Sequence, residues 1–526
     1  MKRGLITSIL ALTFGSLQAQ PLSTAPRLVV TLTIDQLRTD YMEAFSSLYG
    51  ERGFKRLLTE GKVYCQMEMP FKKADRASAL ATLYTGATPS LHGIIAQNWL
   101  DRSTLRPVNC MDDPDFMGNY TDESSSPSQL LVSTLADELK VATRNQGLVY
   151  AIAPFRDAAI LAAGHNGNGA FWLNESTGKW CSTTYYPEFP WWLTQYNEQE
   201  APDLRIPDMV WAPALPVIRY DLLPGGEGKP FKHKPNRDAV NRFRDLMTTP
   251  LINDEVNRVA ERLLDKNDIG RDHTTDLLAL TYYAGTYRQT DVETRPTEIQ
   301  DMYVRLDASL ANLLDLLDRK IGLRNILFCL ASTGYTAPEY ADTPSYRIPG
   351  GEFYLNRCAT LLNMFLMATY GEGQYVEAYH DLQIYLNHSL IEKKQLELAE
   401  IQEKAAGFLV QFSGVDKVYS AYQLLRGAWS PDAGQVCNGF HRKRSGDLLI
   451  EVLPGWTVIQ EGNVKNPSVR YAQPPTPFIL LGNGITAETI RIPASIDRIA
   501  PTLCGALHIR APNACEAQPL QTGTNR

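Results

Sequence analysis

The chain has 526 residues, of which 44% are hydrophobic, and it carries a formal net charge of −7 at pH 7. This apolar content can bury a large core, which excludes an intrinsically disordered protein. Acidic and basic residues are interspersed, so we expect no broad basic face and no nucleic-acid partner.

The N-terminus has the pattern of a secretory signal peptide. Lys2 and Arg3 precede the apolar run Leu5–Leu12, and small and polar residues follow as far as Ala19. The apolar run is too short to span a bilayer, which favours a cleaved signal peptide over residues 1–20. No later run is apolar enough for a transmembrane segment. The sequence therefore predicts a periplasmic or secreted protein.

Strand-like runs recur along the mature chain. The first is Leu28–Ile34, a β-branched run typical of a strand covered on both faces, and it ends at Asp35. Similar runs follow at Leu148–Ile152, Asp276–Tyr282, Asn325–Ala331, Asp447–Leu453 and Pro477–Leu481. Helical patterns separate them, so we predict an α/β fold with a central, mostly parallel sheet between helices. Ligand sites of such sheets lie at the carboxyl ends of strands, which makes Asp35 a candidate site residue.

The clearest helical pattern begins at about Thr297. Its apolar residues fall on one face, and the spacing from Thr297 to Gln300 predicts a capping box at its start. A second stretch, 389–407, is rich in Glu and Lys and is predicted to be one solvated helix.

Residues from about 166 to 250 are rich in Trp, Tyr, Pro and Asn. We interpret them as a cap inserted over the sheet of a single domain spanning residues 21–526. Aromatic residues such as Trp172 and Trp192 are expected to pack on the sheet; alternatively, they line a sugar or nucleotide cleft.

A series of short motifs keeps the order found in a known family. The residues are Ile34-Asp35-Gln36-Leu37-Arg38, Tyr84-Thr85-Gly86, His92-Gly93-Ile94, Ala163-Gly164-His165, Arg305-Leu306-Asp307, Pro454-Gly455-Trp456 and Ala500-Pro501-Thr502. Together they resemble the alkaline phosphatase superfamily, specifically bacterial phosphate-irrepressible alkaline phosphatases and the type I phosphodiesterase/nucleotide pyrophosphatases. The resemblance implies a central mixed sheet, two zinc ions at its carboxyl edge, and a Thr or Ser nucleophile that takes up the phosphoryl group.

Most positions that carry this chemistry are replaced in the chain. Asp35 matches the first metal ligand and Asn98 a phosphate contact, but the nucleophile position is Arg76. A guanidinium cannot be deprotonated in a protein, so Arg76 cannot be a nucleophile. The family's Asp-His-Gly, which supplies two more ligands, here reads Ser332-Thr333-Gly334.

The other ligand positions are also changed. Two of them match Thr286 and Thr290, and the last, a His in the family, falls in Gln473–Thr476, where there is none. The Lys-x-Arg pair that contacts phosphate matches Phe155-Arg156-Asp157. Each zinc needs about four ligands, mostly Asp and His. We therefore predict no metal and no cofactor, with zinc as the alternative.

These replacements favour a catalytically degenerate member of the superfamily, a pseudoenzyme. We expect it to bind a phosphorylated or glycan ligand, or an envelope protein partner, and the degenerate cleft to contain Asp35, Arg76, Asn98, Ser332 and Thr333. The alternative is a zinc-dependent phosphomonoesterase or phosphodiesterase with a rebuilt site, which leaves enzymatic activity open.

Two expectations concern the chemistry of this cleft. Asp35 and Arg76 are predicted to pair, with the guanidinium occupying space and charge vacated by metal. Ser78 and Thr82 are hydroxyls near the lost nucleophile, but without a metal or an adjacent base they stay unreactive.

Overall fold

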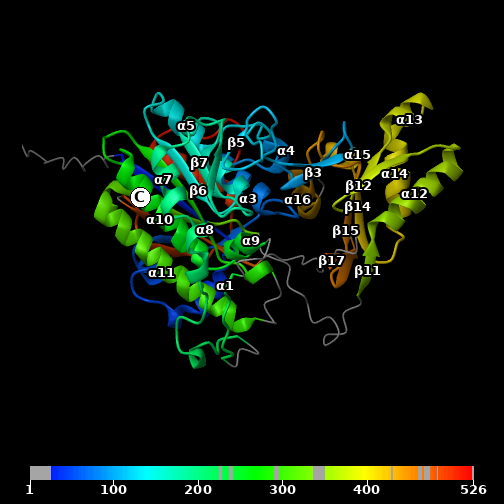
Figure 1. Ribbon diagram of the computed structural model, residues 1–526. Helices are drawn as coiled ribbons and strands as arrows, with labels where there is room; N and C mark the ends of the chain where they lie inside the picture. Colours follow the sequence, from blue (N-terminus) through cyan, green and yellow to red (C-terminus); the bar gives the residue numbers. More distant parts are fainter. Residues whose placement is uncertain are drawn as a thin grey trace, which may run out of the picture.

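The computed structural model describes residues 25–523 apart from 224–227, 236–240, 290–294, 336–349, 428–429, 460–464, 467–473 and 483. The expected signal peptide therefore lies outside the described residues. Figure 1 shows a larger lobe that holds the main sheet and a smaller lobe beside it that carries α12 to α15.

Strand β1 (Leu28–Asp35) lies in the middle of the main sheet. It pairs in parallel with β10 (Ile326–Ser332) and with β9 (Asp276–Tyr283), so that the ends of all three strands meet at one edge. The sheet order is β19-β2-β18-β10-β1-β9-β6-β7-β8-β5, with β20 paired to β2. The remaining strands are β2 (Lys62–Glu68), β5 (Gly118–Asn119), β6 (Val149–Ala153), β7 (Gly169–Leu173), β8 (Trp180–Thr183), β18 (Thr476–Gly482), β19 (Glu488–Ile490) and β20 (Ala494–Ser495). The predicted α/β fold is confirmed.

The side chains of β1 alternate between two hydrophobic cores because successive residues of a strand point to opposite faces. Leu28, Val30, Leu32 and Ile34 enter one core, and Val29 enters the other. Helices on the first face are α1 (Thr39–Ala44), α2 (Phe54–Glu60), α10 (Leu251–Lys266) and α11 (Pro296–Lys320). Those on the second face are α3 (Arg76–Thr85), α5 (Leu135–Ala142), α6 (Arg156–Ala163) and α17 (Ile499–Leu507).

Helix α11 buries its predicted apolar face but begins differently from our expectation. Its N-cap is Arg295, without a side-chain cap, and Pro296 fixes the first turn. The side chain of Gln300 is buried and bonds to the predicted inserted segment 166–250. It donates to Tyr220 O at 3.2 Å and accepts from Leu222 N at 3.0 Å. The predicted capping box was wrong, because the helix has no side-chain cap at Arg295 and the Gln300 amide bonds to residues 220 and 222.

The region expected to be a cap is part sheet and part covering layer. Its first residues form β7 and β8, which extend the main sheet, and the rest includes α7 (Trp191–Gln199), α8 (Pro202–Arg205) and α9 (Arg242–Met247). The buried carboxylate of Glu255 on α10 accepts from Trp180 Nε1 at 3.2 Å and Tyr196 Oη at 2.7 Å. These aromatic side chains therefore pack onto the sheet layer. The predicted boundaries of the domain and its cap stay a prediction.

The smaller lobe has its own sheet and core. Its sheet order is β12-β13-β15-β14, and a three-stranded sheet, β11-β16-β17, lies beside it. The elements are β11 (Gly351–Tyr354), α12 (Leu355–Tyr370), β12 (Val376–His380), β13 (Gln383–Leu386), α13 (His388–Lys393), α14 (Leu398–Leu409), β14 (Val415–Ser420), α15 (Ala421–Leu425), α16 (Pro431–Gly439), β15 (Leu448–Val452), β16 (Trp456–Ile459) and β17 (Lys465–Asn466). The strand predicted at 447–453 thus belongs to this antiparallel sheet, and the helix predicted at 389–407 is two helices.

Asp447, the residue before β15, links several parts of the smaller lobe and joins it to the hairpin of β3 (Asn98–Asp101) and β4 (Arg106–Asn109). Its buried carboxylate accepts from His388 Nε2 at 2.8 Å, Gln402 Nε2 at 3.0 Å and Leu386 N at 2.8 Å. Arg102 from the hairpin donates to it at 3.1 Å. Burial raises the pKa of Asp447, but the His388 bond and the Arg102 charge outweigh it and lower the pKa below its ordinary value.

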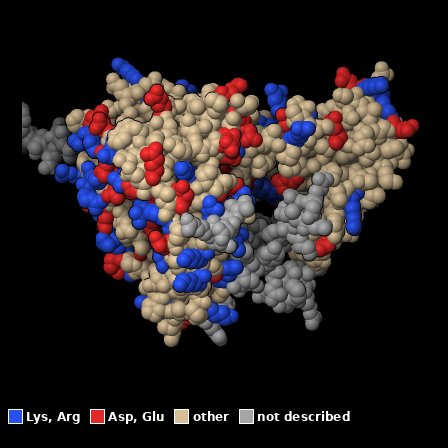
Figure 2. Space-filling model, viewed as in Figure 1, with Lys and Arg blue, Asp and Glu red and all other residues tan. Residues whose placement is uncertain are grey.

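Among the described residues, no helix is long and apolar enough to cross a bilayer. Figure 2 shows Lys and Arg interspersed with Asp and Glu over the face in view. On that face, the charge distribution agrees with the mixed pattern of the sequence.

Asp447→Ala should lower the free energy of unfolding by about 3 kcal/mol, because it leaves the partly buried Arg102 without its carboxylate and several donors unpaired. Urea denaturation followed by circular dichroism measures this. Glu392→Ala, at an exposed position of α13, is the matched control and should change stability by less than about 0.5 kcal/mol. Equal effects of the two substitutions would contradict the role of Asp447.

Candidate functional site

Arg76 begins helix α3 at the carboxyl edge of the main sheet. Asp75 caps this helix: its carboxylate accepts from Ser78 N at 2.9 Å, and Ser78 Oγ accepts from Asp75 N at 3.0 Å. This reciprocal cap fixes the first turn of the helix. The Arg76 side chain therefore leaves a rigid backbone next to the end of β1.

The guanidinium of Arg76 is held on three sides. Its Nε lies 3.1 Å from both carboxylate oxygens of Asp157, its Nη1 lies 3.6 Å from Asp35 Oδ2, and its carbon lies 3.7 Å from the centre of the Phe155 ring. The predicted pairing of Asp35 with Arg76 is present, but Asp157 is the closer partner. Arg76 therefore belongs to a buried charge cluster with one guanidinium and two carboxylates.

Asp35 is fully buried between β9 and β10. Its Oδ1 accepts from Thr333 Oγ1 at 3.0 Å, whereas its Oδ2 has no hydrogen-bond partner among the described residues. Burial raises the pKa of Asp35 to about 6, against the lowering effects of Arg76 and the Thr333 bond. The pKa of Arg76 is raised, because Asp157 and Asp35 outweigh the effect of its burial.

The residues that replace the Asp-His-Gly of the family resemblance serve internal hydrogen bonds. Ser332 Oγ donates to Leu37 O at 2.7 Å and accepts from Gly334 N at 3.2 Å. Thr333 Oγ1 accepts from Gln36 N at 3.2 Å while it donates to Asp35. Both side chains are buried and tie the ends of β1 and β10 together.

Of the five predicted cleft residues, Asn98 lies apart from the other four, which lie at this edge, and only Arg76 lines the cleft in front of it. Asn98 is exposed on β3, where its side-chain oxygen accepts from Asn109 Nδ2 at 3.2 Å. Ser78 and Thr82 are fully buried and donate within α3, to Asp75 and to Ser78 O. Thr290 lies outside the described residues.

A cleft of about 680 Å³ opens in front of Arg76. Phe155, Asp157 and Trp172 line it together with Arg76, and carboxylates such as Glu123 and Glu175 stand in its wall. Trp172 is 2% exposed, and its Nε1 has no hydrogen-bond partner among the described residues. An unpaired buried donor costs free energy, and this indole N–H is not exposed to the cleft.

Sequence reasoning missed the role of Asp157, although its signal was present. The chain has Arg76 at the position of the nucleophile. It also has Asp157 where the resemblance places an Arg. A gained cation and a gained anion at two positions of one site are the expected sign of a new ion pair. The distance of 3.1 Å between them bears this out.

Comparison with known proteins gives matches over nearly the whole chain. The family model described as type I phosphodiesterase/nucleotide pyrophosphatase matches residues 29–473. The chain is 28% identical to alkaline phosphatase PafA of Elizabethkingia meningoseptica, over 96% of each chain. It is 28% identical to alkaline phosphatase PhoV of Synechococcus elongatus, over 93% of this chain and 91% of that one. The crystal structure of wild-type PafA superposes with a TM-score of 0.82 at 27% identity, covering 94% of this chain and 98% of PafA.

These matches overturn our prediction that the protein takes no cofactor. The chain shares, almost from end to end, the scaffold on which the family resemblance implies two zinc ions, so zinc is favoured. The described side chains do not fit such a site by themselves: no three His, Cys, Asp or Glu side chains among them gather to hold a metal ion. Residues 336–349 and 467–473, which flank the ends of β10 and β18 in sequence, lie outside the described residues.

The matched family model, the relatives and the shared fold agree with the motifs in the sequence. The chain belongs to the type I phosphodiesterase/nucleotide pyrophosphatase family, within the alkaline phosphatase superfamily.

Proposed function

We propose that this protein is a phosphoric ester hydrolase with a rebuilt active site. The observation that carries the proposal is the correspondence with PafA, which extends over 94% of this chain at a TM-score of 0.82. Because the matched relatives are named alkaline phosphatases, the comparisons favour our alternative interpretation over a pseudoenzyme.

In this proposal Arg76 binds the phosphoryl group of the ester. Its Nε is used by Asp157 and its Nη1 lies 3.6 Å from Asp35 Oδ2, but the side chain borders the cleft and a guanidinium carries five N–H donors. A planar guanidinium matches the oxygens of a phosphoryl group. Trp172 also lines this cleft, but its Nε1 is buried and not open to it. The N–H groups of Arg76 act on negative charge, which grows on the phosphoryl oxygens during transfer.

A second candidate function is binding of a phosphoric ester without turnover. One observation favours it: the hydroxyls of Ser78, Thr82 and Thr333 are fully buried and engaged in hydrogen bonds within the protein. A hydroxyl nucleophile must reach the phosphorus atom and lose its proton to a base. Thr333 has a carboxylate beside it, but burial separates it from the cleft in this conformation.

We also propose that the protein works outside the cytoplasm. Support comes from the signal-peptide pattern at residues 1–20, which implies export to the periplasm or the medium. An envelope protein partner or a glycan ligand stays a prediction from the sequence.

Purified protein should hydrolyse p-nitrophenyl phosphate or bis(p-nitrophenyl) phosphate, and Arg76→Met should lower kcat/KM by about 100-fold, because it removes charge from the phosphoryl site. Release of p-nitrophenol measures the rate. Arms with added zinc and with EDTA separate metal-dependent from metal-independent turnover.

The matched control is Arg156→Met, which borders the same cleft but is paired with Asp112 at 3.0 Å, away from Arg76. It should retain most of the activity. If wild-type protein shows no turnover in any arm but binds p-nitrophenyl phosphate calorimetrically, the hydrolase proposal fails and the binding function replaces it.

Asp35→Asn should change stability in a pH-dependent way. Because the pKa of Asp35 is raised to about 6 in the folded protein, its stabilising contribution is present at low pH and is lost as pH rises through 6. The Asn variant should therefore gain about 2 kcal/mol relative to wild type between about pH 4 and pH 7. Denaturant unfolding at several pH values measures the difference.

Asp447→Asn is the matched control with the opposite sign. Its pKa is lowered, so the wild-type carboxylate stabilises the fold above its unfolded pKa, and this contribution is lost as pH falls. The Asn variant at position 447 should lose stability relative to wild type as pH rises. The same slope for both variants would contradict the assigned charge environment of Asp35.

A further inference from the structure

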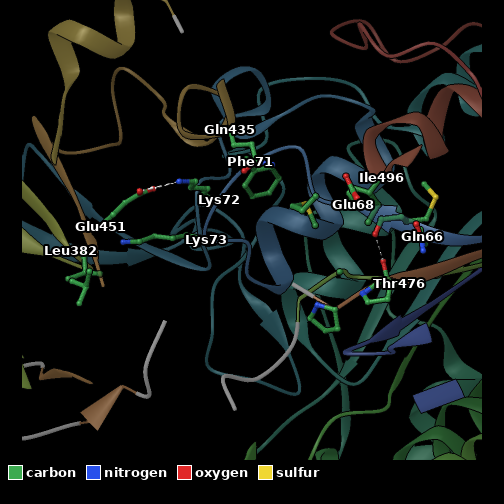
Figure 3. A pocket seen from close by; sticks show the side chains of 16 residues that line it. Gln66, Glu68, Phe71, Lys72, Lys73, Leu382, Gln435, Glu451, Thr476 and Ile496 are labelled. Atoms are coloured by element: carbon green, nitrogen blue, oxygen red, sulfur yellow. Dashed lines mark hydrogen bonds and ion pairs between the residues drawn. The ribbon is translucent and has the colours of Figure 1, made fainter. Parts of the chain in front are cut away.

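A second cavity, of about 430 Å³, lies between the edge of the main sheet and the smaller lobe. Met67 and Thr476 come from the paired strands β2 and β18, whereas Leu382 and Val452 come from the smaller lobe. Figure 3 shows these two sides, with Phe71 between them. None of Asp35, Arg76, Asp157 and Trp172 lines this cavity.

Most of the wall is apolar. Phe71, Met67, Met69, Val452 and Ile496 are each buried core residues that also border the cavity. An aromatic ring and flexible Met side chains adapt to a flat apolar ligand. The cavity is therefore suited to a small organic molecule with an apolar body.

The two neighbouring lysines in the wall differ in their partners. Lys72 Nζ lies 2.8 Å from Glu451 Oε1 and 2.5 Å from Asp432 Oδ1, so its charge is neutralised. Lys73 Nζ lies 3.4 Å from the carbonyl oxygen of Asp381, and no carboxylate of the described residues pairs with it within 4.0 Å. Lys73 is thus a cation with donor capacity left for a ligand.

The surrounding protein also acts on the Lys73 ammonium. It lowers the pKa of Lys73, and the charges of Asp381 and Glu451 only partly oppose this. Lys73 is nevertheless an exposed residue, so its ammonium stays in contact with solvent while it borders the cavity.

The backbone around Lys73 is strained where it meets the smaller lobe. Lys73 has φ 54°, and the two turn residues between β12 and β13, Asp381 and Leu382, have φ 43° and 60°. A turn with positive φ at both positions favours Asn and Gly, so Leu382 is unfavourable there. Non-glycine residues held in this region concentrate at ligand sites. The turn places Leu382 in the wall and the Asp381 carbonyl at Lys73.

We propose that this cavity binds a small amphiphilic monoanion, with its apolar body against Phe71 and its anionic group on Lys73. Glu68 lies at the other end of the cavity, apart from Lys73 in Figure 3, and it disfavours a second negative charge on the ligand. Gly334 and Pro474–Thr476 also line this cavity, so it adjoins the positions where the family resemblance places metal ligands. It differs from the cleft at Arg76 because its cation is Lys73 and its wall includes the smaller lobe.

Binding of 2-naphthoate and of its neutral isostere 2-naphthamide to the full-length mature protein tests the proposal. Fluorescence titration should give a dissociation constant for naphthoate at least about tenfold lower than for the amide, because only the carboxylate pairs with Lys73. Lys73→Gln should remove this preference and leave amide binding unchanged. Naphthalene-2,6-dicarboxylate should bind more weakly than naphthoate.

The control variant is Lys393→Gln, which removes an equal charge from an exposed position on α13 and should keep the preference. Arg76→Met should also bind naphthoate like wild type, whatever its effect on hydrolysis, which separates this site from the proposed function. Equal affinity of wild type for acid and amide, or no binding of either, overturns the proposal without any variant having to fold. Loss of the preference in Lys393→Gln overturns it as well.

Discussion

A buried guanidinium at the carboxyl edge of the sheet determines the arrangement of this site. A charge removed from water is stable only when counter-charges and hydrogen bonds surround it, and breaking such a buried pair typically costs about 3–5 kcal/mol. Arg76 meets this requirement through Asp157, Asp35 and the face of Phe155. These contacts join the first turns of α3 and α6 to the end of β1, so the charge cluster holds three elements of the carboxyl edge of the sheet in place.

The same cluster explains why the chain keeps the fold of the family while the side chains at the sheet edge differ from those of the family's zinc site. The hydrophobic cores on both faces of the sheet depend on the pattern of apolar residues, which tolerates changes at the sheet edge. Family membership follows from that scaffold and from motifs outside the metal positions. Reactivity depends on a few side chains at the edge, where an arginine and several hydroxyls stand in place of ligands and a nucleophile. The full-length likeness to alkaline phosphatases nevertheless corrects the prediction that no cofactor is bound.

The smaller lobe adds surfaces that the main sheet alone would lack. Asp447 and Arg102 connect it to the β3–β4 hairpin, and the β12–β13 turn brings Leu382 and the Asp381 carbonyl to the segment before α3. That segment runs from the cavity at the lobe boundary to the cap of the helix that carries Arg76. The two cavities therefore share one stretch of backbone although their wall residues differ in chemistry: one wall is rich in charged and polar groups, and the other is mainly apolar.

The sequence by itself determined the central strands, the apolar face of α11, the position of Asp35 and the replacement of a nucleophile by Arg76. The strands, the apolar face and the position of Asp35 follow from local periodicity, which a linear pattern records directly. The replacement at position 76 follows from the resemblance to the alkaline phosphatase superfamily. Only the tertiary structure decided that 447–453 joins a separate antiparallel sheet, that Gln300 bonds across to Tyr220 instead of capping its helix, and that Asn98 stays outside the cleft. Tertiary structure also made Asp157 the main partner of Arg76, at a separation of 81 residues. Such pairings are set by packing between distant segments, and their energies do not appear in the sequence around either partner.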